Sequence, residues 1–268
     1  MRLRVFTGAD TAQAIAAARA ALGPEALVLD QRRVRGGMEI TAAVEQSPDN
    51  PPSASDMLAR HGVPEPLARI LAVSPLALPS RLRFSTLPEG PLMLVGPPGA
   101  GKTLATIRLA TRAVLAGQTP RIAGTDMRRA GNELASLLAV LGLYPHPDAM
   151  TASIVDTAGI DVFDPPSHAE LPAIQATRVL VLPADLDPVS AAETAAAWRA
   201  CGCTHLIATR LDLTLRLGAL LAAADTGLVL TLASLSPATN VAMAPLTPGF
   251  LASRLARAPF RSLINELS

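Results

Sequence analysis

Two hydrophobic patterns alternate along the chain from residue 92 onward. Short apolar runs are followed by longer segments whose apolar positions recur every three or four residues. The runs predict buried strands and the longer segments predict helices, an order typical of a mostly parallel sheet covered by helices on both faces. The predicted strands are 92–95, 121–124, 153–155, 179–182, 206–208 and 228–232. Residues 91–268 are therefore predicted to form one α/β domain.

The N-terminal residues 1–45 have a shorter pattern of their own. A strand-like run at 3–6 precedes Asp10, and Gln13 three positions later completes a capping box for an alanine-rich helix. That helix should end at the Gly-Pro pair 23–24. Two further strands, 26–29 and 38–44, should follow. The pattern predicts a small βαββ unit.

Three arginines lie within residues 32–35, in the expected connection between the last two of these strands. A solvated hairpin is one interpretation of this basic stretch, and a surface for acidic lipid or a partner is the other. Acidic residues nearby largely balance its charge.

The stretch 46–55 is rich in proline, serine and other polar residues, so it is interpreted as a linker between domains. Residues 56–90 then form a short helical region, with predicted helices at 56–61 and 65–71.

The most apolar stretch of the chain is 217–235. Asp225 and Gly227 interrupt it where a helix would give way to a strand. It is therefore interpreted as a helix followed by a buried strand, and not as a membrane span.

Composition narrows the possible functions. The chain of 268 residues is 50% hydrophobic but only 3% aromatic, and its net charge is +1. A weak charge and few aromatic residues argue against bulk nucleic acid as the main partner. The N-terminus has no apolar signal segment, so a cytoplasmic protein is expected. Cys201 and Cys203 match neither a zinc knuckle nor a redox pair.

The strongest motif follows the strand at 92–95 and opens onto a helical pattern. It matches GxxxxGK[ST], in which a glycine-rich loop turns its backbone N–H groups toward phosphate. Lys102 should reach the β and γ phosphates, and the Thr103 hydroxyl should bind Mg²⁺. Lys102 is the only lysine among 23 basic residues, at the place where a compact ammonium fits between phosphates. The expected nucleotide-binding residues here are Gly96, Gly99, Ala100, Gly101, Lys102, Thr103 and Leu104.

A second motif, Asp-Thr-Ala-Gly at 156–159, follows the apolar strand at 153–155. Behind a phosphate loop, such a carboxylate holds Mg²⁺, usually through water. The N–H group of Gly159 can then sense the γ phosphate. Asp156 is therefore a predicted metal ligand.

A third motif, Thr-Arg-Leu-Asp at 209–212, follows the strand at 206–208. It approximates a Thr-Lys-x-Asp guanine reader, in which Asp212 accepts bonds from the N1–H and 2-amino groups that adenine lacks. Arg210 replaces the lysine, and its aliphatic stem can still cover the base. Thr209, Arg210 and Asp212 are the predicted base-binding residues, with a surface Asp that caps the next helix at Thr214 as the alternative.

With the segment 124–134, which carries Asp126, Arg129 and Glu133, these motifs resemble the signal-recognition-particle (SRP) class of GTPases. Residues 1–45, including the run 21–30, resemble the small B domain of FlhF-type GTPases, the flagellar members of that class. The resemblance implies a P-loop NTPase fold with an SRP-type G domain over 91–268, preceded by the B-like unit and the short N region.

The resemblance also implies a function. GTP or GDP with Mg²⁺ would be bound, and a homodimer would form in the GTP state. The biology implied is flagellar placement at the cell pole, with peripheral association at the inner membrane and an FlhG-like, MinD-family ATPase as partner. Asp126 would bind Mg²⁺ and orient the attacking water, and Arg129 would contact the γ phosphate beside Lys102. Arg128 is the other candidate for that phosphate contact.

Three departures from the family pattern bear on hydrolysis. Ile160 stands where the family often has arginine, Asp126 and Asp156 are only 30 positions apart, and the N region is short. Slow, dimer- or partner-stimulated GTP hydrolysis is the leading hypothesis. The alternatives are a nucleotide-loaded scaffold that scarcely hydrolyses GTP, and a P-loop ATPase of related fold.

Overall fold

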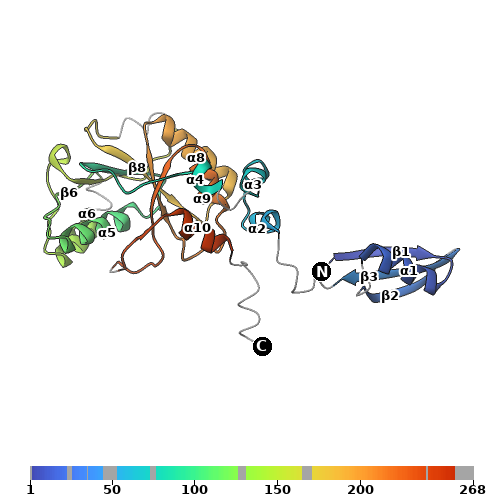
Figure 1. Cartoon of the computed structure of the whole chain (residues 1–268). Coiled ribbons are helices and arrows are strands. Elements are labelled where there is room, and N and C mark those ends of the chain that lie inside the picture. The colour runs from blue at the N-terminus through green and yellow to red at the C-terminus, as the bar shows by residue number, and fades with distance from the viewer. Residues whose placement is uncertain are drawn as a thin grey trace. The chain divides into compact units, whose positions relative to one another are not determined.

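The structure, a computed structural model, describes residues 2–22, 26–34, 36–44, 53–72, 77–125, 131–164, 171–239 and 241–256. The chain divides into two compact units, Met1–Pro52 and Ser53–Ser268 (Figure 1).

The first unit has the predicted βαββ order. Its elements are β1 (Arg2–Gly8), α1 (Thr11–Leu22), β2 (Leu27–Val34) and β3 (Gly37–Val44). The strands form an antiparallel sheet in the order β1-β3-β2. Helix α1 packs on one face, where Ala14, Ala18, Ile40 and Ala42 are buried together. The backbone N–H of Gln13 donates to the Asp10 carboxylate at 2.8 Å, which confirms the predicted cap.

Strand β2 is longer than the sequence predicted. It continues through Val34, so Arg32 and Arg33 lie within the strand and not in a turn. Arg32 pairs in register with Glu39 of β3, and their side chains form an ion pair at 2.6 Å. This cross-strand pair gives the basic residues a place in the sheet that the sequence pattern alone did not indicate.

The second unit is built on an eight-stranded sheet in the order β11-β10-β9-β8-β5-β7-β6, with β4 also paired to β10. Every pairing is parallel except that of β11. The six predicted strands are confirmed as β5 to β10, whereas the two-residue strands β4 and β11 were not predicted. The strands are β4 (Arg83–Phe84), β5 (Leu92–Val95), β6 (Ile122–Gly124), β7 (Ile154–Asp156), β8 (Thr177–Pro183), β9 (His205–Thr209), β10 (Val229–Ala233) and β11 (Ala244–Pro245).

Helices cover both faces of this sheet (Figure 1). Along β5, Leu92 and Leu94 pack toward one hydrophobic cluster, whereas Met93 and Val95 pack toward the other. The first cluster contains residues of α5 (Lys102–Leu115) and α6 (Gly131–Val140). The second contains residues of α8 (Pro188–Ala200) and α9 (Gly218–Asp225). A strand buried on both faces explains the continuous apolar runs in the sequence.

Residues 53–90 belong to the same unit as the sheet. They form α2 (Ala54–Arg60), α3 (Glu65–Ala72) and α4 (Ala77–Arg81), of which only the first two were predicted. Their buried residues Leu58, Leu71 and Leu78 share one cluster with Leu251 of α10 (Pro248–Leu255). The short helical region therefore completes the core on one face of the sheet.

The apolar stretch 217–235 forms α9 and β10, as predicted. Across the part of the chain that the structure describes, no helix is long and apolar enough to cross a membrane.

Candidate nucleotide-binding site

Three of the sequence motifs meet at one edge of the sheet. The phosphate loop follows β5, the Asp-Thr-Ala-Gly turn includes the end of β7, and the Thr-Arg-Leu-Asp segment includes the end of β9. Strand β5 lies between β7 and β8, and β9 follows β8, all in parallel. The carboxyl ends of these strands therefore bring the three motifs together, where open α/β sheets bind ligands.

The glycines of the phosphate loop are required by its backbone. Gly96 has φ of +149°, and a Cβ there would lie 2.3 Å from the carbonyl oxygen of Val181 in the neighbouring strand. Gly99 and Gly101 have φ of +70° and +87°, in the left-handed region that favours glycine. Gly101 caps α5, and no side chain of the described residues bonds to that cap. The first-turn N–H groups, which have no partner within the helix, could therefore bind an anion.

Lys102 is buried, with 6% of its surface exposed. Its Nζ donates to the carbonyl oxygens of Gly96 at 3.1 Å and Pro97 at 3.0 Å, both in the phosphate loop. Burial lowers the pKa of Lys102 to about 8, and the negative charge of Asp156 opposes this shift. The ammonium is held within the loop, where an arriving phosphate would raise its pKa again.

Two of the three predicted metal ligands, Thr103 and Asp156, are in direct contact, and the third, Asp126, lies outside the described residues. Thr103 Oγ1 donates to Asp156 Oδ2 at 2.7 Å, and Asp156 is buried. A hydroxyl and a carboxylate that lie side by side at the start of a helix are oxygen donors of the kind that Mg²⁺ prefers. These two residues therefore fit a magnesium ion beside the phosphate loop.

The Asp-Thr-Ala-Gly turn packs directly on the phosphate loop. Ile160 N–H donates to the carbonyl of Gly96 at 3.3 Å. A Cβ at Gly159 would lie 2.6 Å from the Cα of Pro98, so only glycine allows this approach. The Ile160 side chain is buried in the hydrophobic core. The position at which the family pattern has a cation is thus a core position in this chain.

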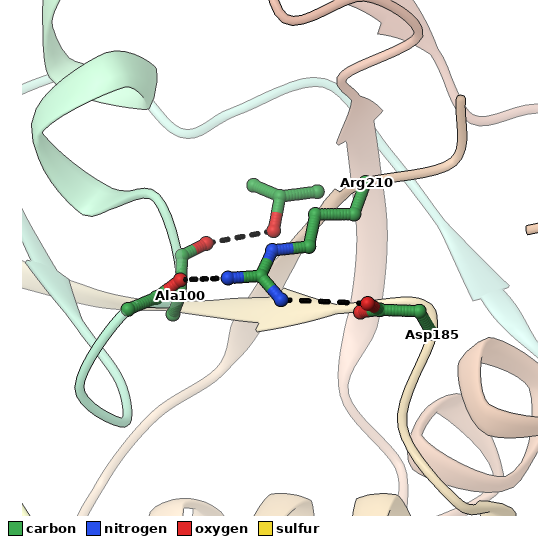
Figure 2. A network of polar contacts seen from close by, with 5 residues as sticks. Ala100, Asp185 and Arg210 are labelled. Atoms are coloured by element: carbon green, nitrogen blue, oxygen red, sulfur yellow. Dashed lines mark hydrogen bonds and ion pairs between the residues drawn. The ribbon is translucent and has the colours of Figure 1, made fainter. Parts of the chain in front are cut away.

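The predicted base-binding segment is tied to the same loop (Figure 2). Thr209 Oγ1 donates to the carbonyl of Ala100 at 2.7 Å, and Arg210 Nη2 donates to the carbonyl of Gly99 at 2.7 Å. Arg210 has φ of +58°, the one positive φ of a non-glycine residue within the described ranges. Strain of this kind is tolerated where neighbouring contacts hold the residue in place.

Asp185 is a site residue that the sequence analysis missed. It follows β8, and its Oδ2 lies 3.4 Å from Nη1 of Arg210, so the guanidinium connects Asp185 with the phosphate loop (Figure 2). The available signal was a carboxylate two residues after a buried strand of a parallel sheet. Asp187, two residues on, caps α8 through the N–H groups of Val189 and Ser190.

Asp212 is exposed in the turn that follows Arg210. Helix α9 begins after Leu217 with no side-chain cap among the described residues, so Asp212 does not serve as the helix cap that was the alternative interpretation. Its charge opposes the lowering of the Arg108 pKa that burial causes.

Arg108 is a second residue that the sequence analysis missed. It is buried on α5, and it donates to Ser234 Oγ and to the carbonyls of Ser236 and Ala238, in the loop after β10. Arg108 therefore holds that loop beside the turn with Asp212. The available signal was an arginine between Ile107 and Leu109 on an otherwise apolar stretch of helix.

Asp126, Arg128 and Arg129 lie outside the described residues. Thr125, just before them, donates its N–H to the carbonyl of Asp156 at 2.9 Å and accepts from the N–H of Ala158 at 3.2 Å. The described part of the connection from β6 to β7 contains α6 and the short helix η1 (Ala149–Thr151).

Comparison with known proteins supports the fold. No family model and no curated protein matches this chain. Among solved structures, FlhF complexed with GTP and Mg²⁺ has a TM-score of 0.62 at 18% identity, covering 76% of this chain and 98% of that one. Chloroplast FtsY from Physcomitrella patens has a TM-score of 0.60 at 18% identity, covering 75% and 85%.

The signal recognition particle receptor FtsY from Elizabethkingia anophelis has a TM-score of 0.59 at 18% identity, covering 76% of this chain and 84% of that one. These likenesses, with the mostly parallel sheet, establish the fold of an SRP-type G domain. Identity this low establishes the fold alone.

Proposed function

We propose that this chain, folded like the SRP-type GTPases, binds GTP with Mg²⁺ and acts as a guanine-nucleotide switch. One observation carries the proposal: the base-binding segment is bonded to the phosphate loop by Thr209 and Arg210. These bonds keep Asp212 next to a loop built for phosphate. A nucleotide whose phosphates lie in the loop would therefore present its base to Asp212.

Each part of the nucleotide has a chemical counterpart. Lys102 and the first-turn N–H groups of α5 would bind the β and γ phosphates. Thr103 and Asp156 would hold Mg²⁺, which neutralises phosphate charge when bound. The Asp212 carboxylate would accept two hydrogen bonds from guanine, whereas adenine would leave it unpaired. Arg108 would support the loop after β10 around the base.

The finer proposal is an FlhF-type GTPase with slow hydrolysis that is accelerated in a GTP-dependent homodimer. Support comes from the βαββ unit, from the run 21–30 that resembles the FlhF B domain, and from the likeness to FlhF in complex with GTP and Mg²⁺. We propose Asp126 and Arg129 as the residues that orient water and contact the γ phosphate. Flagellar placement, an FlhG-like partner and peripheral membrane association belong to this finer proposal.

A second candidate is a nucleotide-bound scaffold with little hydrolysis. The buried side chain of Ile160 favours it, because the residue after the Asp-Thr-Ala-Gly turn offers no cation to the γ phosphate. Such a protein would use bound GTP to fix its shape or its affinity for a partner.

Equilibrium binding and turnover test these proposals together. With Mg²⁺ present, GTP and GDP should bind much more tightly than ATP, and equal or tighter ATP binding would favour the ATPase alternative. Turnover of GTP per chain is then measured as protein concentration is raised. A rise in specific activity supports the dimer-stimulated GTPase, whereas GTP binding with flat, negligible turnover supports the scaffold.

A further inference from the structure

Strand β2 forms an exposed edge of the sheet in the first unit. The strand order β1-β3-β2 places it at one side of the sheet, and no described residue outside β3 pairs with it (Figure 1). Seven of its eight residues are exposed. The backbone N–H and C=O groups on its outer side can therefore form a ladder with a further strand.

The apolar end of β2 is not covered by the helix of the first unit. Helix α1 buries Ile40 and Ala42 of β3 and partly covers Phe6 of β1, and no described residue of β2 belongs to that cluster. Residues 27–29 of β2 are all apolar, and each is between 40% and 54% exposed. Removing part of this apolar area from water would favour contact with another strand.

Two opposite charges lie two residues apart on the face of β2 that α1 leaves open. Gln31 pairs in register with Ile40, which is buried under α1, so the neighbours Asp30 and Arg32 lie on the opposite face. Arg32 donates through Nε and Nη2 to Glu39, which leaves its Nη1 group for a further acceptor. Asp30 forms no hydrogen bond or ion pair with the described residues. The edge thus offers one acceptor and one donor to a partner.

We propose that β2 pairs antiparallel with β2 of a second copy of this chain, about a two-fold axis at Gln31. Such an axis is perpendicular to the sheet, and it places side chains of the same face opposite each other. Asp30 of each copy then lies opposite Arg32 of the other. An axis at Asp30, Arg32 or Arg33 would instead place two like charges opposite each other. The charges therefore select the register centred on Gln31.

The same charges favour a second copy over an unrelated segment. Charged residues on an edge strand discourage pairing with a strand of arbitrary sequence, because that strand leaves them unmatched. A strand that matches β2 must carry an acidic residue two positions before a basic one when it runs antiparallel, and β2 itself has this order. Pairing would extend the contact of Arg32 with Glu39 into a row that ends at Asp30 of the second copy. The two-fold axis repeats this row.

Pairing through β2 would bring two nucleotide-binding units into one particle. A GTP-dependent contact between those units would then become an intramolecular step, which raises its effective concentration. This consequence rests on the proposed function, whereas the pairing of β2 does not.

Sedimentation equilibrium of the full chain without nucleotide tests the pairing. The wild type should show a monomer–dimer equilibrium with a Kd tighter than about 1 mM. Asp30→Arg places two guanidinium groups opposite each other at both ends of the pair, so it should raise the Kd by about tenfold or more. Glu89→Arg makes the same change of charge at an exposed position of the second unit, and it is the matched control that should leave the Kd unchanged.

A charge exchange separates pairing from a general effect on folding. Arg32→Glu alone should weaken the dimer as Asp30→Arg does. An equimolar mixture of the two variants should dimerise again, because each strand then meets its complement. The proposal is overturned if the wild type stays monomeric or if Asp30→Arg dimerises as well as the wild type. It is also overturned if the mixture stays monomeric while both variants keep the circular dichroism spectrum of the wild type.

Disulfide cross-linking measures the register independently of these charges. Facing Cα atoms of antiparallel strands lie about 4.5–5.5 Å apart, a distance that a disulfide can span. Oxidised Gln31→Cys should therefore form a covalent dimer, whereas Thr7→Cys, at an exposed position of the other outer strand, should not. A Gln31→Cys chain that cross-links no better than Thr7→Cys would overturn the proposal. No arm contains nucleotide, so failure here is separate from a failure of the proposed function.

Discussion

The two halves of the candidate site differ in the interactions that fix them to the phosphate loop. The half assigned to phosphate and base is fastened by side chains that bond to phosphate-loop carbonyls, those of Lys102, Thr209 and Arg210. The half formed by the Asp-Thr-Ala-Gly turn rests on close backbone packing at Gly159 and on the buried side chain of Ile160. If the proposed function holds, the difference predicts that substitutions in the Asp-Thr-Ala-Gly turn change the response to the γ phosphate more than they change binding of the base.

Of the substitutions considered, Ile160→Arg should have the largest effect, which is a loss of folding stability. It restores the residue that the family pattern often has, but it places a guanidinium in the hydrophobic core. An unpaired buried charge should cost on the order of 3–5 kcal/mol, and the thermal midpoint should fall by roughly 10 °C. Ile160→Val is the control and should cost about 1 kcal/mol. Thermal unfolding followed by circular dichroism checks this, and an unchanged midpoint would show that the position tolerates a cation.

Gly159→Ala tests how closely the turn must approach the phosphate loop. The added methyl group would meet the Pro98 backbone at 2.6 Å, so the turn must move away. We expect GTP affinity to fall by about tenfold, or roughly 1.4 kcal/mol. Gly249→Ala, where the nearest atom to the added Cβ is 4.0 Å away, should leave binding unchanged. Calorimetric titration measures both, and equal affinities would refute the close approach.

The pH dependence of nucleotide affinity sharpens the account of the phosphate half. Because the pKa of Lys102 is lowered to about 8, the ammonium is charged before and after binding at lower pH. Above pH 8 Lys102 has lost that proton in the free protein but keeps it in the nucleotide complex, where phosphate raises its pKa, so binding must take up a proton. Affinity should then fall by about tenfold per pH unit.

Lys102→Met is the control for this profile. The variant lacks the lysine amine, whereas the guanine base of the nucleotide still titrates as it does with the wild type. Its weaker binding should show a flatter dependence between pH 7.5 and 9.5. Parallel profiles for the two proteins would place the titrating group elsewhere.

Asp185→Ala should have the smallest effect. The ion pair with Arg210 is partly exposed and 3.4 Å long, so its loss should weaken GTP binding only about two- to threefold. In an Arg210→Lys background the same substitution should be neutral. The guanidinium reaches Asp185 and Gly99 through two different nitrogens, whereas an ammonium has one nitrogen and cannot bridge the two residues. A double-mutant cycle of affinities measures this coupling, and additive effects would remove Asp185 from the site.

Features with a local sequence signature could be predicted. Strands buried on both faces are continuous apolar runs, so β5 to β10 were recognised in order, and the helix cap at Asp10 was recognised from two residues. The contact of Thr103 with Asp156 joins two such motifs.

Features that depend on a distant partner could not be predicted. Strands β4 and β11 have two residues each, too few for any periodicity, and both exist only because they pair with β10. Arg32 pairs in register with Glu39 on the neighbouring strand, a contact that the local sequence does not indicate. Asp185 and Arg108 join the site through residues 25 and more than 120 positions away. No local pattern encodes such proximity.

The most direct test of guanine recognition is equilibrium binding of GTP, ATP and xanthosine triphosphate to the wild type and to Asp212→Asn, with Mg²⁺ present. The account predicts that the wild type prefers GTP over ATP by about a hundredfold or more. Asp212→Asn should lose that preference and gain affinity for xanthosine triphosphate, whose 2-carbonyl can accept a bond from the new amide. A wild type that binds ATP as well as GTP, or a variant that still prefers GTP, would contradict the role of Asp212.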